Sequence, residues 1–258
     1  MNLFNPHLHL REMVIVGAGG TGAQIARSVA RMMYDMRRAQ LDPPLLRLID
    51  PDSVTEKNVG RQLFTAADVG QPKAVVLMRR FNLALGLDVS AVVEPFEAER
   101  HLTSRHHSSV LLIGAVDNER ARQQLAAAEG VLWLDCGNFT NAGQVVLGNT
   151  GQRERVLQQL AANTPVYRYL PNAALLFPQL LEPEPPVVPS LLSCADLMAV
   201  GEQGLVVNDL IAAIASQYIW KLLYRQPIQS FASFIDGDSL AVRSPMICRD
   251  ELLPYLTA

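Results

Sequence analysis

The sequence contains few cysteines, and no two of them are closely spaced. Its 258 residues include three cysteines: Cys136, Cys194 and Cys248. An odd number of widely separated cysteines does not predict a closed disulfide framework. Free thiols are typical of proteins in a reducing compartment. The composition therefore favours a cytoplasmic protein over a secreted, disulfide-stabilised one.

Histidine is also scarce, and the sequence does not suggest a histidine metal site. The five histidines are His7, His9, His101, His106 and His107. They fall near the N-terminus or in expected loops. His106 and His107 are adjacent, but the sequence offers no further partners with metal-ligand spacing. We expect all five histidines on the surface.

Strong charge and a membrane-spanning run are lacking as well. The formal net charge is -3 and the pI is about 6.0, so no surface for duplex nucleic acid or for an anionic membrane is predicted. No basic segment leads into an apolar stretch before the first expected strand, near Arg11, so we expect no secretion signal. The most apolar segment, residues 204–224, contains Asn208, Asp209 and Lys221. These polar residues favour a core or interface helix over a membrane span.

The first 150 residues alternate between short apolar runs and segments in which apolar residues have helical spacing. Expected strands cover residues 13–16, 45–49, 89–94, 110–114 and 131–134, and expected helices cover residues 24–38, 73–85 and 118–128. Such alternation is typical of a doubly wound, mostly parallel sheet. We therefore predict an α/β fold of the Rossmann type.

The rest of the chain has a different character. Residues 163–200 contain seven of the sixteen prolines, which exclude long helices and central strands and predict a long crossover loop. A helix is expected next, followed by an antiparallel hairpin around the Asp-Gly-Asp turn at residues 236–238. We interpret residues 1–258 as one domain, with a nucleotide-binding core at about 11–150, the crossover at 163–200, and the helix and hairpin at 204–258.

A glycine-rich motif follows the first expected strand. Residues 17–22 read Gly-Ala-Gly-Gly-Thr-Gly and fit the pattern G-x-G-x-x-G between a strand and a helix. Gly17 permits a tight turn, Gly19 lets backbone N–H groups approach a phosphate, and Gly22 lets the helix pack on the strand. Together with Gly20, they predict a nucleotide site at a helix N-terminus. The motif alone leaves NAD, FAD and ATP open, as well as a glycine-rich turn without a ligand.

Polar residues are concentrated after the second expected strand. Asp50 ends that strand and is placed to accept a hydrogen bond from a ribose hydroxyl. Attack of a carboxylate on ATP requires groups that hold a polyanion and neutralise charge on the departing pyrophosphate. Arg61 and Lys73 suit that role, and Asn58 could bind a ribose or phosphate oxygen without adding charge.

Three motifs in this region resemble the signature of the ThiF, MoeB and ubiquitin-activating-enzyme superfamily. They are Asp50-Pro51-Asp52-Ser53-Val54, Asn58-Val59-Gly60-Arg61-Gln62 and Asp68-Val69-Gly70-Gln71-Pro72-Lys73. The pair Asp117-Asn118 after a later strand agrees with the same family, as do residues 135–138 and 143–145. The resemblance covers about Met13 to Val146.

Each of these residues also has a purely structural interpretation. Asp52 could cap a turn, Arg61 could pair with Glu56, and Asp117 could cap its helix. Independent structural needs would not reproduce the order and spacing of a whole family, so together the motifs favour the superfamily. Asp68 is expected to be structural.

The resemblance implies an ATP-dependent adenylating enzyme that activates the C-terminal carboxylate of a small ubiquitin-like protein. It implies that Asp117 holds Mg²⁺, that Arg61 and Lys73 act in catalysis, and that Cys194 is a candidate acceptor of the acyl group. The implied nucleotide-binding residues are Gly17, Gly19, Gly20, Gly22, Asp50, Asp52, Asn58, Arg61, Gln62, Lys73 and Asn118. Related enzymes are dimers, so a homodimer is implied, with residues 204–224 as a candidate interface.

The sequence departs from the family pattern at two points. Many relatives bind zinc through two C-x-x-C pairs, which this chain lacks, so no zinc is expected. Relatives often supply an arginine from the N-terminus of the neighbouring subunit, whereas here only Arg11 precedes the first expected strand. Cys194 could also be an ordinary buried cysteine.

The chain has a long first helix, no zinc-binding cysteines and the stretch Gly201-Glu202-Gln203. In these features it resembles the ThiF-family proteins of PRTRC systems, which are bacterial, plasmid-associated gene sets. That similarity implies a bacterial cytoplasm and a ubiquitin-like protein encoded nearby. Three alternatives stay open: a catalytically silent nucleotide-binding scaffold for a ubiquitin-like partner, an NAD-dependent oxidoreductase, and an adenylating dehydratase that modifies tRNA.

Overall fold

The computed structural model describes residues 3–4, 9–102, 109–139, 141–162, 164–183 and 205–257. The predicted acyl acceptor Cys194 lies outside these ranges, and so does much of the proline-rich segment. Three of the histidines lie outside them too: His7, His106 and His107.

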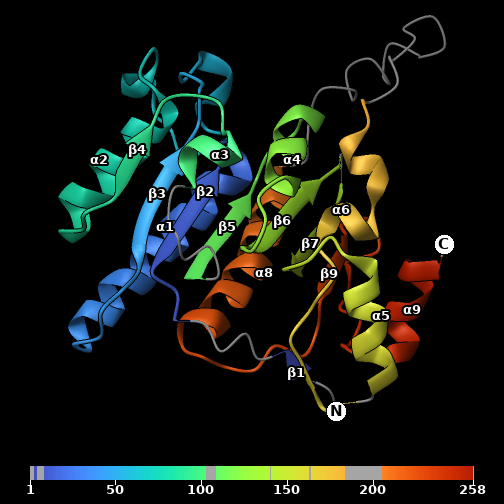
Figure 1. Ribbon diagram of the computed structural model, residues 1–258. Coiled ribbons are helices and arrows are strands. Elements are labelled where there is room, and N and C mark those ends of the chain that lie inside the picture. Colours follow the sequence, from blue (N-terminus) through green and yellow to red (C-terminus); the bar gives the residue numbers. More distant parts are fainter. Residues whose placement is uncertain are drawn as a thin grey trace, which may run out of the picture.

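An eight-stranded sheet forms the centre of the described structure, in the order β10-β9-β7-β6-β5-β2-β3-β4 (Figure 1). Its strands are β2 (Glu12–Val16), β3 (Leu45–Ile49), β4 (Ser90–Val92), β5 (Val110–Gly114), β6 (Leu132–Asn138), β7 (Ala142–Gly148), β9 (Ala232–Asp236) and β10 (Ala241–Arg243). The strands from β4 to β6 are parallel, whereas β7, β9 and β10 pair in antiparallel fashion. A separate parallel pair joins β1 (Leu3–Phe4) to β8 (Val166–Tyr167). The predicted α/β fold, with a mostly parallel sheet and a C-terminal antiparallel hairpin, is confirmed.

Helices cover both faces of this sheet. The α-helices are α1 (Gly20–Arg38), α2 (Lys73–Leu85), α3 (Ala98–His101), α4 (Glu119–Ala126), α5 (Arg153–Ala162), α6 (Ala173–Leu176), α8 (Leu205–Leu223) and α9 (Arg249–Thr257). Short 3₁₀ turns are η1 (Glu56–Asn58), η2 (Ala66–Asp68) and η4 (Pro178–Leu181). Helices α1 and α8 pack against each other on one face, and α4 lies on the opposite face (Figure 1).

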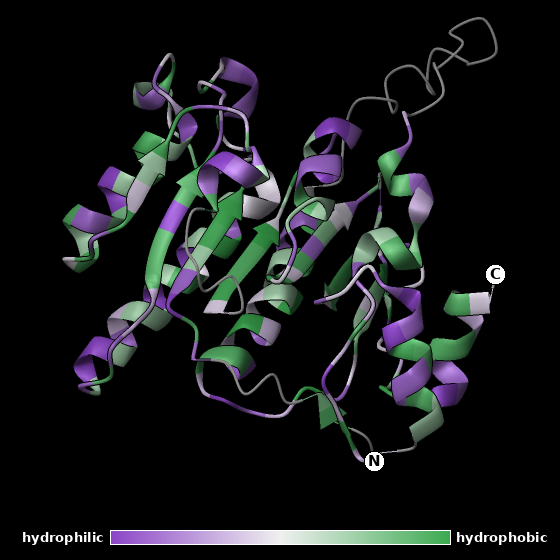
Figure 2. Cartoon of the chain, viewed as in Figure 1, coloured by the Kyte–Doolittle hydropathy of each residue, from purple (hydrophilic) through white to green (hydrophobic). Residues whose placement is uncertain are grey.

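Apolar periodicity explains this layering. The central strand β5 is buried at all five positions, as expected for a parallel strand with helices on both sides. Helix α8 buries Ile211, Ala215 and Ile219, which recur every fourth residue and so share one side of the helix. Figure 2 shows the apolar strands in the interior and the polar positions on outer helix surfaces.

Strand order places a crevice at one end of β2. The chain passes from β2 through α1 to β3 on one side, and later returns to β5 on the other side of β2. Val16 pairs with Ile49 of β3 and with Gly114 of β5, so the three carboxyl ends are level. Ligands of doubly wound proteins bind at such a topological switch point.

Several element boundaries differ from the prediction. The strands 45–49 and 110–114 and the helix 73–85 lie where expected. Strand β6 continues to Asn138, because antiparallel pairing with β7 extends it beyond the parallel part. The sequence did not predict helices α5 and α9. Among the helices in the described ranges, none is long and apolar enough to cross a membrane.

Candidate nucleotide site

The glycine motif forms a tight turn between β2 and α1. Gly17 has φ +92°, and a Cβ there would lie 2.3 Å from the carbonyl oxygen of Ala115. A Cβ on Gly22 would lie 1.8 Å from the carbonyl oxygen of Gly17, so only glycine lets the helix approach the turn this closely. Helix α1 starts without a side-chain cap. The first backbone N–H groups of a helix have no intrahelical partner, and Gly19, Gly20 and Thr21 line the cavity, so this helix end suits an anion.

Asp50 joins the glycine turn to the loop after β3. Its two carboxylate oxygens accept hydrogen bonds from the backbone N–H of Ala18 at 2.5 Å and of Asp52 at 2.8 Å. Burial raises the pKa of Asp50, and these two hydrogen bonds oppose that shift. Each oxygen keeps one further acceptor position. These positions leave room for the predicted hydrogen bond from a ribose hydroxyl, which stays a prediction. The structure also shows that Asp50 connects the glycine turn to the loop after β3, which the sequence did not predict.

Lys73 reaches the crevice from the first residue of α2. Its Nζ lies 2.9 Å from Oδ2 of Asp52, and its backbone N–H donates to the carbonyl of Asp52. The Lys73 side chain is 10% exposed and the Asp52 side chain 65% exposed. The loop between β3 and α2 thus folds back on itself, as the sequence suggested. It brings Lys73 beside the glycine turn.

The loop between β3 and α2 places the other three predicted site residues differently. Gln62 lines the cavity beside Gly19, whereas Asn58 and Arg61 are not among the lining residues. Asn58 uses its side-chain oxygen to accept hydrogen bonds from the backbone N–H and the hydroxyl of Thr55. This local capping interaction holds Asn58 in its turn. The nucleotide contacts of Asn58 and Arg61 remain predictions.

Asp117 and Asn118 lie where β5 ends and α4 begins. Asn118 caps α4, since its side-chain oxygen accepts from the backbone N–H of Ala121 at 2.9 Å. The capping role that Asp117 could have taken therefore belongs to Asn118. Within the described ranges, the only contact that the Asp117 carboxylate accepts is one of 3.4 Å from the Asn118 amide. It lies exposed on the cavity wall.

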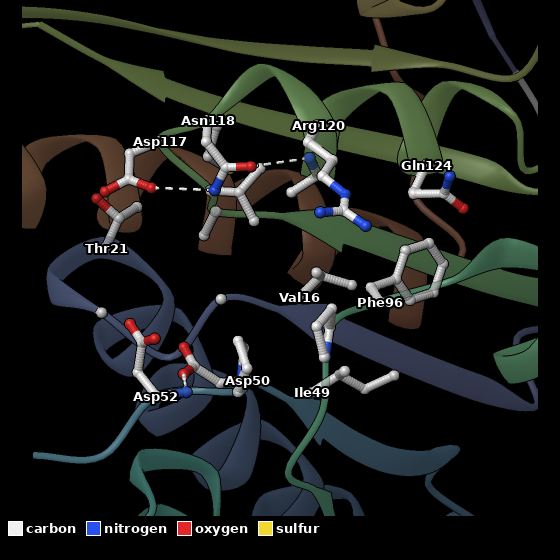
Figure 3. Close-up of a pocket in the computed structure, with 18 of the residues that line it drawn as sticks. Val16, Thr21, Ile49, Asp50, Asp52, Phe96, Asp117, Asn118, Arg120 and Gln124 are labelled. Atoms are coloured by element: carbon white, nitrogen blue, oxygen red, sulfur yellow. Dashed lines mark hydrogen bonds between the residues drawn. The ribbon is translucent and has the colours of Figure 1, made fainter.

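These elements enclose a cavity of about 720 Å³. That volume lies within the range of small-molecule and cofactor sites. Figure 3 shows Thr21 and Asp117 on one side of the cavity and Phe96 and Gln124 on the other. The glycine turn, Asp52 and Lys73 belong to the polar side. One end of the cavity is thus suited to phosphates, and the other end combines the Phe96 ring with the polar Gln124.

The structure corrects the expectation for His101 and reveals the wall at Phe96. His101 is buried, with 5% of its surface exposed, and its ring stacks on Phe96 with 5.7 Å between centroids. Its Nε2 lies 2.9 Å from Glu94, and its Nδ1 accepts from the backbone N–H of Glu97. These contacts fix the Phe96 ring at the cavity. No local pattern in the sequence predicts this arrangement, because the four-residue helix α3 is too short to show a periodicity.

Sequence reasoning also missed the part played by Asn208 of α8. The Asn208 side-chain oxygen accepts hydrogen bonds from Thr21 Oγ1 at 3.1 Å and from Asn138 Nδ2 at 2.6 Å. A Cβ on Gly20 would lie 2.7 Å from the Asn208 amide nitrogen. Asn208 therefore packs directly under the start of α1. In the sequence, Asn208 stands out as a polar residue in an apolar helix. That position argues against a membrane span, but it does not predict a contact with α1.

A buried carboxylate and a thiol lie next to each other in β6. Cys136 lines the cavity, although the side chain is 3% exposed. Burial and the neighbouring Asp135 raise the pKa of the Cys136 thiol well above its ordinary value. Burial raises the pKa of Asp135 to about 6, against the opposing charge of Arg122. Both carboxylate oxygens of Asp135 lack a hydrogen-bond partner within the described ranges.

Comparisons with known proteins agree with this fold. The sequence model of the ThiF family matches residues 6–236. No curated protein sequence matches the chain. Solved structures that match include E. coli MccB with ATP, at 16% identity and a TM-score of 0.57, and E. coli MccB with AMPCPP and MccA, at 16% identity and a TM-score of 0.58. Each match covers 93% of this chain and 64% of the MccB chain.

A third match is the microcin C7 biosynthetic enzyme MccB in complex with N-formylated MccA, at 16% identity and a TM-score of 0.57. It covers 93% of this chain and 65% of that one. The chain thus spans less than two thirds of the MccB length. At this identity the likeness concerns the fold.

Proposed function

Since the chain belongs to the ThiF family, we propose that it adenylates the C-terminal carboxylate of a small ubiquitin-like protein at the cavity between β2 and β5. The observation that carries the proposal is the joint position of an uncapped helix N-terminus, Lys73 and Asp117 around one cavity. A polyphosphate needs all three kinds of group: backbone donors, a cation and a ligand for its counter-ion. MccB, whose fold is similar, was solved with ATP and with MccA.

The proposed reaction is a displacement at the α-phosphorus of ATP. A carboxylate oxygen of the partner forms a bond to that phosphorus. The bond from the phosphorus to the bridging oxygen of the β-phosphate breaks, and pyrophosphate leaves with the bonding electrons. The products are an acyl-adenylate and pyrophosphate. Most of the catalysis in such a transfer comes from positioning and charge stabilisation.

Four groups of this chain would position the substrates and stabilise the charge: the start of α1, Lys73, Asp50 and Arg61. The N–H groups at the start of α1 bind the phosphate oxygens, and the Lys73 ammonium offsets negative charge that grows on the pyrophosphate. Asp50 holds the glycine turn in place and offers its remaining acceptor positions to the ribose. Arg61, whose side chain lies outside the cavity lining, is proposed to join the phosphates when ATP is bound.

Asp117 fits a role in holding Mg²⁺. Its carboxylate lines the cavity and, among the residues that the structure describes, makes only the long contact to Asn118. No group of three potential metal-ligating side chains occurs in the described ranges, but Mg²⁺ is usually held by one or two carboxylates together with substrate phosphates and water. When bound there, Mg²⁺ would neutralise charge on the phosphate oxygens.

The acyl group of the adenylate could be transferred to a cysteine of this chain. Cys136 lines the cavity, but the raised pKa of its buried thiol leaves little thiolate, and the thiolate is the nucleophile. Cys194 therefore remains the proposed acceptor for a thioester step. We further propose a homodimer in a bacterial cytoplasm and a partner encoded nearby, as in PRTRC systems.

ATP–pyrophosphate exchange tests the proposal directly. Wild-type protein and a candidate ubiquitin-like partner are compared with the variants Lys73→Met, Asp117→Asn and Arg61→Ala, and with a partner that lacks its last two residues. Exchange that needs the intact partner terminus and falls at least about 100-fold in Lys73→Met and Asp117→Asn is expected. Arg153→Ala, on the distant helix α5, is the control and keeps exchange.

Other outcomes favour the alternative functions. Binding of ATP and of the partner without any exchange would indicate a catalytically silent scaffold. Binding of NADH without ATP would indicate an oxidoreductase. Exchange that a tRNA substrate stimulates, and that the ubiquitin-like protein does not, would indicate a tRNA-modifying dehydratase.

A further inference from the structure

Acidic side chains predominate around the cavity. The lining includes five carboxylates: Asp50, Asp52, Glu97, Glu99 and Asp117. It includes two permanent cations, Lys73 and Arg120. Lys73 is already paired with Asp52, whereas the Arg120 side chain makes no ion pair or hydrogen bond with other residues in the described ranges. An unpaired guanidinium in a cavity is available to a ligand.

The direction of Arg120 indicates which part of a ligand it meets. In Figure 3 the guanidinium points from α4 across the cavity towards Val16 and Phe96, away from Asp117 and Thr21. The phosphate-binding groups, Thr21 and the uncapped start of α1, lie on the opposite side. Arg120 thus faces the end of the cavity that contains Val16 and Phe96.

The surroundings of Arg120 are rigid. Helix α4 is fixed at its first turn by the Asn118 cap. One turn beyond Arg120, the Gln124 side chain accepts a 3.4 Å contact from the backbone N–H of Ala98, next to the Phe96 wall. On the outer side of α4, Gln123 donates to the carbonyl of Leu181 at 2.8 Å. These contacts hold the backbone of α4 against the Phe96 segment before a ligand binds, whereas the exposed Arg120 side chain extends from it towards the cavity.

A nucleobase can bind between a flat guanidinium and apolar or aromatic side chains opposite it. Arginine planes stack on bases, and the interaction combines dispersion with cation–π attraction. Val16, Ile49 and Phe96 provide the opposite surface. We propose that Arg120 stacks on the base of the bound nucleotide and thereby contributes to nucleotide affinity. This inference rests on the proposed nucleotide function and adds a residue to it.

A phosphate series separates this role from a phosphate contact. Dissociation constants of adenosine, AMP and ATP are measured without any partner protein, for wild type and for the variants Arg120→Met and Arg120→Lys. Arg120→Met keeps the length of the side chain and removes the plane and the charge, whereas Arg120→Lys keeps the charge alone. Both variants are expected to weaken all three ligands by a similar factor, about 5- to 10-fold. Arg153→Met serves as the matched control and leaves binding unchanged.

Three results would overturn the assignment: a loss that increases with the number of phosphates, an Arg120→Lys variant equal to wild type, or unchanged binding in Arg120→Met. Thermal melting curves of each variant verify folding. If adenosine binding depends on Arg120 but partner-dependent exchange is absent, the stacking role stands and adenylation fails. If wild-type protein binds none of the three ligands, both proposals fail.

Discussion

The side-chain oxygen of Asn208 accepts a hydrogen bond from Thr21 Oγ1, although the two residues are 187 positions apart in the sequence. The same oxygen accepts a hydrogen bond from Asn138. One asparagine thus ties α8 to the start of α1 and to the end of β6. All three residues lie at or beneath the proposed phosphate end of the cavity.

The Asn208 contacts predict a measurable cost when the side chain is removed. Asn208→Ala removes two hydrogen bonds, those from the Thr21 hydroxyl and the Asn138 amide, which should lower the free energy of unfolding by about 2 kcal/mol. Urea unfolding measures this change. Asp209→Ala, at an exposed position of the same helix, should stay within about 0.5 kcal/mol of wild type. Equal stability of the two variants would contradict the assignment.

Substitution by alanine should lower stability at one glycine of the motif and ATP affinity at another. A Cβ on Gly22 would clash with backbone at 1.8 Å, so Gly22→Ala should cost about 3 kcal/mol of stability. A Cβ on Gly19 would meet only the Gln62 side chain at 3.9 Å. Gly19→Ala should therefore fold normally and weaken ATP binding, because its methyl group enters the space of the phosphates. Calorimetric titration and thermal unfolding of both variants test the contrast.

The buried Asp135 should make stability depend on pH in the acid range. Its pKa is raised from 3.8 to about 6 in the folded protein, so the folded state binds the proton more tightly than the unfolded state. This contribution to stability is complete below about pH 4 and is lost as pH rises to about 6. The loss is on the order of 2–3 kcal/mol. Arg122 is the charged group that opposes the shift.

Asp135→Asn removes this titration while preserving the shape of the side chain. The difference in unfolding free energy between wild type and variant, measured in urea at several pH values, should shift in favour of the variant between about pH 4 and pH 6. A difference that does not change across this range would contradict the raised pKa.

Cys136 should be chemically inert in the folded protein. Its thiol is buried and its pKa is raised, so it should react slowly with iodoacetamide at neutral pH. A variant that retains only this cysteine, made with Cys194→Ser and Cys248→Ser, allows the rate to be followed by mass spectrometry. Labelling in buffer should be at least about 100-fold slower than in urea. Equal rates would show that the thiol is accessible and reactive.

The sequence predicts the core of this fold because the decisive signals are local. The apolar runs at residues 45–49 and 110–114 become β3 and β5 without change of boundary. The glycine motif and Asp50 fall at carboxyl ends of adjacent strands, so their proximity follows from parallel topology alone.

Residues that reach the cavity from distant or irregular segments could not be predicted in the same way. Arg120 is one of two arginines in the short helix α4, and only the orientation of that helix decides which of them faces the cavity. Phe96 precedes a four-residue helix, and its position depends on the burial of His101. The motif around Asn58 predicts a nucleotide contact. In the structure, the backbone N–H and the hydroxyl of Thr55 both donate to the side-chain oxygen of Asn58 and would compete with such a contact.

Asp50 has a consequence for the kinetics of ligand binding. One carboxylate fixes the backbone of the glycine turn and that of the loop after β3 through two hydrogen bonds. The conformational entropy of both segments is therefore lost when the chain folds, and little remains to be lost when a nucleotide arrives. The part of the cavity around Asp50 should therefore have the same conformation before and after a nucleotide binds. Association there should proceed in a single kinetic phase whose rate increases linearly with nucleotide concentration.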